Sequence, residues 1–134
     1  MLYTFAIIVP AGRAEATPLE QELNLCHGYI HRLNIRFPPG PQGMVYLAIY
    51  HREHQVWPNT PDEAFNGEDE TVDSFEHFDL TEPPHNLLVR AWSPGTTYNH
   101  TITIRIGILP RAVLLPLAKL DGLLRKFFKI LGVK

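Results

Sequence analysis

The chain lacks most of the residue patterns that identify disulfide-bonded, membrane-spanning or catalytic proteins. Its single cysteine, Cys26, cannot form an internal disulfide bond. No run of about 18 apolar residues is present, so we expect no transmembrane helix. Serine occurs only at Ser74 and Ser93, and neither lies in a GxSxG motif. Walker and Rossmann glycine patterns are also missing. These absences predict a non-enzymatic protein with no cofactor.

Lysine is absent from residues 1–110, where six arginines stand against thirteen acidic residues and leave a balance of −7. Residues 111–134 contain two arginines, four lysines and one acid, Asp121, which gives a balance of +5. The acidic body argues against nucleic-acid binding through its surface. The opposite charges predict that the two parts have different roles.

The N-terminal segment MLYTFAIIVP is apolar, but no basic residue precedes the apolar run and Pro10 ends it early. A secretory signal peptide needs a basic segment before its apolar core. We therefore recognise no secretion signal and interpret residues 2–9 as a first β-strand.

Twelve prolines divide the 134 residues into short segments and argue against a helical bundle. Between them, apolar and polar residues alternate, as in strands that bury one face. The predicted strands are 2–9, 19–26, 29–37, 44–51, 54–58, 71–80, 86–92 and 98–109, of which 54–58 is either a continuation of the preceding strand or a separate one. About eight antiparallel strands in two sheets is the jelly-roll count. We therefore predict that residues 1–110 form an all-β antiparallel sandwich of jelly-roll type, with an immunoglobulin-like sandwich as the alternative.

Residues 111–134 change from strand to helical periodicity, which predicts a basic amphipathic C-terminal α-helix. Its apolar positions are Leu117, Leu120, Leu124, Phe127 and Leu131, and its cationic positions are Lys119, Lys126 and Lys129. Because so much of this helix is apolar, we expect it to bury a second surface. That surface is either a neighbouring subunit or an anionic membrane. We favour the subunit, since the acidic body has the complementary charge.

Histidines and tryptophans are the remaining candidates for a site. His27 and His31 would lie about 13 Å apart on a strand, and the spacing of His51 and His54 suits a turn. No pattern brings together the three or four ligands that zinc requires, so no metal site is predicted. Three aromatic residues form an alternative glycan-binding platform: Trp57, Trp92 and Tyr98. Packing in the core or at the rim of a sandwich is the simpler interpretation of these rings.

Three stretches carry a resemblance to a known group of proteins: IRFPPGPQGMVYLAIYHREHQVWPNTP, EDETVDSFEHFDLTEPPHNLLVRAW and YNHTITIRIGILP. Over residues 3–110 the chain resembles small jelly-roll proteins of prokaryotes and their viruses, near the capsid and tail accessory proteins of tailed phages. The resemblance implies a virion structural protein and brings no catalytic residues with it.

Two functions follow as hypotheses. The first is a non-enzymatic structural protein that forms a homo-oligomer or docks on a larger viral or cellular particle through the sandwich and the C-terminal helix. The alternative is a carbohydrate-binding module of jelly-roll type that uses exposed aromatic residues. A cupin-like metalloenzyme is a third interpretation, and it requires clustered histidines on inward strand faces. The sequence leaves the localisation open between a virion and another particle.

Overall fold

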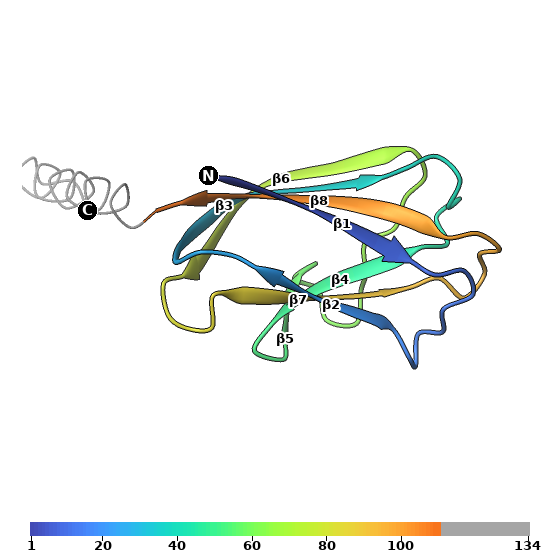
Figure 1. The fold of residues 1–134 in the computed structure, drawn as a ribbon, viewed down its shortest axis with the longest axis horizontal. Helices are drawn as coiled ribbons and strands as arrows, with labels where there is room; N and C mark the ends of the chain where they lie inside the picture. Colours follow the sequence, from blue (N-terminus) through green and yellow to red (C-terminus); the bar gives the residue numbers. More distant parts are fainter. Residues whose placement is uncertain (111–134) are drawn as a thin grey trace, which may run out of the picture.

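Eight strands form two antiparallel four-stranded sheets in the computed structural model, which describes residues 1–110 (Figure 1). The strands are β1 (Leu2–Val9), β2 (Leu19–Asn24), β3 (Gly28–Phe37), β4 (Tyr46–His51), β5 (His54–Trp57), β6 (Glu70–Leu80), β7 (Asn86–Trp92) and β8 (His100–Leu109). The prediction of an antiparallel β-sandwich is confirmed. The helix predicted for residues 111–134 lies outside the described residues, and with it the expected assembly positions.

The two sheets have the strand orders β1-β8-β3-β6 and β2-β7-β4-β5. Of the consecutive strands in residues 1–110, only β4 and β5 lie in the same sheet. Each of the other connections passes from one sheet to the other. Figure 1 shows the first sheet as the upper layer and the second as the lower layer. This order places β1 and β6 at the edges of the first sheet, and β2 and β5 at the edges of the second.

The core lies between the sheets and follows the predicted alternation. Four isoleucines of β8, at positions 102, 104, 106 and 108, are fully buried, and so are Leu33 and Ile35 of β3. Leu47, Ile49 and Val89 face them from the second sheet. Burial of each such side chain contributes about 1.5–3 kcal/mol, so these rows are the main reason why the two layers stay together.

The strand boundaries differ from the predictions at a few points. β2 ends at Asn24, because the Leu25 N–H turns to the carbonyl of His85 at 3.0 Å. Cys26 therefore follows β2 and is half-buried, whereas the predicted strand 19–26 included it. β5 is a separate strand that pairs with β4 in a hairpin, and its turn residues Arg52 and Glu53 both have positive φ.

Gly28 allows β3 to begin directly against the end of β8. A Cβ at this position would lie 2.6 Å from the carbonyl oxygen of Leu109 and 2.6 Å from Cγ2 of Ile108. The β1–β8 ladder brings the end of β8 beside the start of β1, and Figure 1 places the N-terminus at the same end of the sandwich. No helix in the described part of the chain is long and apolar enough to cross a bilayer.

Candidate assembly edge and ligand face

The outer edge of β1 exposes backbone hydrogen-bonding groups. Met1 and Ile108 exchange two hydrogen bonds of 2.7 Å, so they form a hydrogen-bonded pair of the β1–β8 ladder. Such pairs alternate with non-hydrogen-bonded pairs in an antiparallel ladder. The odd-numbered residues of β1 therefore bond to β8. The N–H and C=O groups of Leu2, Thr4, Ala6 and Ile8 point away from it, and within residues 1–110 no strand pairs with them.

The side chains of these four residues are also exposed and carry no charge. Leu2 is 63% exposed and Ile8 is 59% exposed, which is unusual for large aliphatic residues. The register of β1 against β8 runs without a bulge from Leu2 to Val9. A long, regular and apolar edge strand is a template for pairing with another chain.

The other three edges carry the features that discourage such pairing. β6 has four acidic residues along its length, β2 exposes Glu20 and Glu22, and β5 has only four residues. Charged side chains and short strands are the usual protection of sheet edges. Among the described residues, β1 is thus the edge best suited to association.

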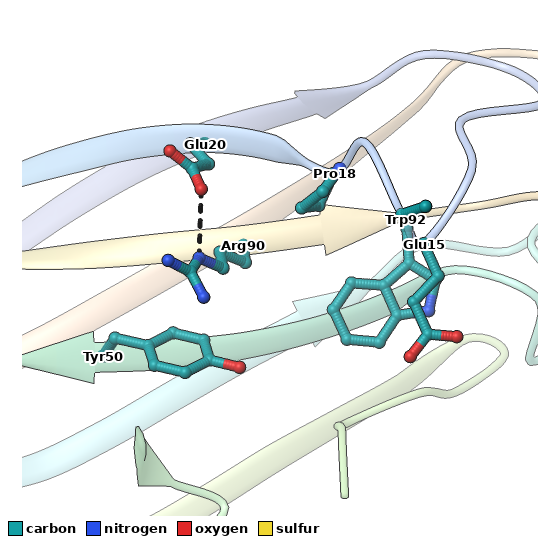
Figure 2. Close-up of a pocket in the computed structure, with 7 residues that line it drawn as sticks. Glu15, Pro18, Glu20, Tyr50, Arg90 and Trp92 are labelled. Atoms are coloured by element: carbon teal, nitrogen blue, oxygen red, sulfur yellow. Dashed lines mark hydrogen bonds and ion pairs between the residues drawn. The ribbon is translucent and has the colours of Figure 1, made fainter. Parts of the chain in front are cut away.

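A second feature is the outer face of the sheet β2-β7-β4-β5, shown in Figure 2. Arg90 lies at its centre, with Nε 3.0 Å from Oε1 of Glu20 and the guanidinium carbon 4.6 Å from the ring centroid of Tyr50. Trp92 stacks beside Tyr46, with ring centroids 6.0 Å apart and an angle of 16° between the planes. The face therefore combines a paired cation with three aromatic rings.

Two hollows meet on this face at Trp92 and Glu15. The first, of about 340 Å³, is also lined by Pro18, Glu20, Tyr50 and Arg90. The second, of about 410 Å³, lies between Tyr46, Asp62, Glu63, Asn66 and Pro94. We call these two hollows, which share Trp92 and Glu15, the groove; aromatic side chains and carboxylates line both of them.

Side chains fix the loops that form these walls. Gln55 Nε2 lies within 2.8–3.2 Å of the carbonyl oxygens of Pro58, Thr60 and Glu63, which holds the loop after β5 in place. Arg13 donates to the carbonyl of Thr17 at 2.6 Å, so it closes the loop that carries Glu15. The hollows are therefore built before any ligand arrives.

The structure separates the three predicted platform residues. Trp57 is only 3% exposed and packs edge-on against Phe78, with centroids 5.5 Å apart. The expectation that Trp57 could stack on a sugar is wrong, because both of its ring faces are covered by the core. Tyr98 is 76% exposed but lines a different hollow, beside Met44 and His100. Only Trp92 belongs to the groove.

Tyr46 and Tyr50, which complete the groove, were not among the predicted platform residues, because the run MVYLAIYH is almost entirely apolar. The signal was nevertheless present. Tyr46 and Tyr50 are half-buried and alternate with Leu47 and Ile49 of the core cluster, so the tyrosines face outward although Ala48 between them is also fully buried.

The histidines do not converge. His51 lies opposite His54 in the β4–β5 hairpin, and His51 Nε2 lies 3.2 Å from the carbonyl of Pro84. His27 packs edge-on against His85 at 5.3 Å. Within residues 1–110 there is no group of three or more histidine, cysteine, aspartate or glutamate side chains that could hold a metal ion.

Near these histidines, the carboxylate of Asp79 accepts hydrogen bonds from the hydroxyl and the N–H of Thr81. These bonds favour the charged form and lower the pKa of Asp79 below its usual range. Asp79 also lines a hollow of about 300 Å³ with His51, Arg52 and Glu82. This hollow lacks the aromatic floor of the groove around Trp92.

Comparison of the chain with known proteins found no matching family model and no matching curated protein.

Proposed function

We propose that this protein is a non-enzymatic assembly protein, a sandwich of jelly-roll type that self-associates or docks on a larger viral or cellular particle. The observation that carries the proposal is the outer edge of β1, which is long, regular, apolar and unprotected. The strand orders support the jelly-roll type, since eight strands cross repeatedly between two sheets. Jelly rolls serve in both capsid and lectin domains.

The preferred partner of the edge is a second copy of this chain. A two-fold axis midway between Phe5 and Phe5 of the second copy sets Leu2 opposite Ile8 of that copy, and Thr4 opposite Ala6. In this register every outward backbone group of the four residues is paired across the interface. The apolar Leu2 and Ile8 side chains meet as a cross-strand pair, which is favourable. No like charges oppose each other, because β1 contains no charged side chain.

Residues 111–134 supply a second contact in this proposal. Their balance of +5 complements the balance of −7 on residues 1–110, and opposite charges on two parts of one chain favour contact between subunits. Two independent contacts allow an assembly to grow beyond a dimer. An anionic membrane is the other surface that would suit the same cationic positions.

The direct test is the mass of the full chain in solution over a range of concentrations, by analytical ultracentrifugation. Ala6→Lys places a charge on the free edge and should weaken association. Thr103→Lys is the matched control, because Thr103 lies opposite Ala6 in the ladder and is separated from the edge by β1. This control should associate like the parent chain.

Two results would count against the proposal. A chain that stays monomeric at high concentration, with no partner recovered, has no assembly role. Equal association of the two lysine variants would show that assembly does not use the β1 edge.

A further inference from the structure

The groove around Trp92 is not needed for pairing through β1, since it lies on the outer face of the other sheet. We propose that this groove binds a neutral oligosaccharide. The inference does not depend on the assembly function. The binding residues that it names are Trp92, Tyr46, Tyr50 and Arg90, in place of the platform that the sequence predicted.

The floor of the groove suits the apolar face of a sugar ring. Trp92 is half-buried against Tyr46, so its orientation is fixed while part of its surface stays open. A rigid, amphipathic ring contributes a large contact area at low entropic cost. Both hollows are lined by this ring and by Glu15. Their volumes of about 340 and 410 Å³ fall in the range of small-molecule sites, so a ligand of more than one sugar unit fits the groove.

The walls suit sugar hydroxyl groups, which both donate and accept hydrogen bonds. Carboxylates of Glu15 and Glu63 accept, and the guanidinium of Arg90 has donors beyond the one that it uses for Glu20. Because the walls are held by Gln55 and Arg13, little ordering is required on binding.

Electrostatics disfavours an acidic ligand on this face. An acidic glycan or a nucleic acid would meet Glu15, Asp62 and Glu63. A basic peptide would be attracted to these carboxylates but would have to cover Arg90, which is paired with Glu20 and seated on Tyr50 at the centre of the face. A neutral oligosaccharide can hydrogen-bond to both the carboxylates and Arg90 without bringing an unpaired charge to the face.

The test is a glycan array of neutral and acidic oligosaccharides probed with the full chain, followed by titration calorimetry on the ligands found. Trp92→Ala should weaken binding at least about tenfold, as expected for a central aromatic contact. Phe75→Ala is the matched control, because Phe75 is 81% exposed on the outer face of the other sheet and should not contribute.

Circular dichroism establishes that each variant is folded, and Glu15→Gln gives a second test that leaves the stacked rings intact. This exposed side chain borders both hollows, so its change should also weaken binding. Silence on the neutral glycans, or binding that survives both Trp92→Ala and Glu15→Gln, would overturn the proposal. Selective binding of acidic glycans or of basic peptides would overturn the class of ligand.

Discussion

Proline at position 6 tests the assignment of the β1 edge most sharply, because it removes one backbone donor. In the proposed two-fold pair the Ala6 N–H donates to the Thr4 carbonyl of the second copy, and the symmetric bond is lost as well. Two hydrogen bonds at about 0.5–1.5 kcal/mol each give a loss of about 1–3 kcal/mol in association. This loss corresponds to a dissociation constant that is about 5- to 150-fold higher.

The fold itself should tolerate Ala6→Pro. The N–H that proline lacks points away from β8, and proline is accepted in edge strands where the N–H faces solvent. Ile7→Pro removes an N–H that points to β8 and should destabilise the sandwich beyond the effect of Ile7→Ala. Sedimentation measures association, and urea unfolding measures stability. Equal destabilisation by Ala6→Pro and Ile7→Pro would refute the assigned alternation, and unchanged association of folded Ala6→Pro would refute edge pairing.

Three further outcomes follow from the described residues and the tail. Trp57→Ala should cost about 3–5 kcal/mol in urea unfolding, because it leaves a cavity in the core; a loss close to zero would contradict its burial. Thr81→Val removes one donor to Asp79 and should raise the pKa of that carboxyl toward its usual range, as followed by NMR titration. The lowered pKa of Asp79 stabilises the fold at pH values above the pKa of this carboxyl in the unfolded chain. This stabilisation is lost as the pH falls through the pKa in the folded protein, so the variant, which has less of it, should lose less stability on acidification. Truncation after Pro110 should leave a folded sandwich, since all eight strands precede it, but one that no longer forms the full-size assembly; sedimentation of a full-size particle would show that the tail is not needed.

The core of this sandwich was predictable because its signal is local. In β8, isoleucines alternate with Thr101, Thr103 and Arg105, so the pattern alone identifies the buried face. The strand predicted for residues 71–80 rested on the same kind of pattern, and β6 spans Glu70–Leu80.

Trp57 shows where a local pattern fails. Trp57 is buried because a register shift between Ile49 and Tyr50 aligns it with Ile49, on the inner face of β4. Nothing within the segment HQVWP specifies that shift. Trp92, by contrast, follows its local pattern: it alternates with the buried Val89 and Ala91 of β7 and lies on the outer face with Arg90, opposite Tyr46 of β4. The groove and the free edge both depend on strand order, which long-range pairing determines and which residue types alone do not encode.

The proposed edge pair also determines how the groove is presented. A two-fold axis between antiparallel strands stands perpendicular to the sheet, so equivalent faces of the two copies point in the same direction. The sheets β2-β7-β4-β5 of both copies would then lie side by side, with both Trp92 grooves on one surface. When two sites face one glycan-coated surface, binding at the first site raises the effective concentration of glycan at the second. Weak binding by each groove would then suffice for firm attachment of the assembly, while a separate soluble oligosaccharide would still exchange freely.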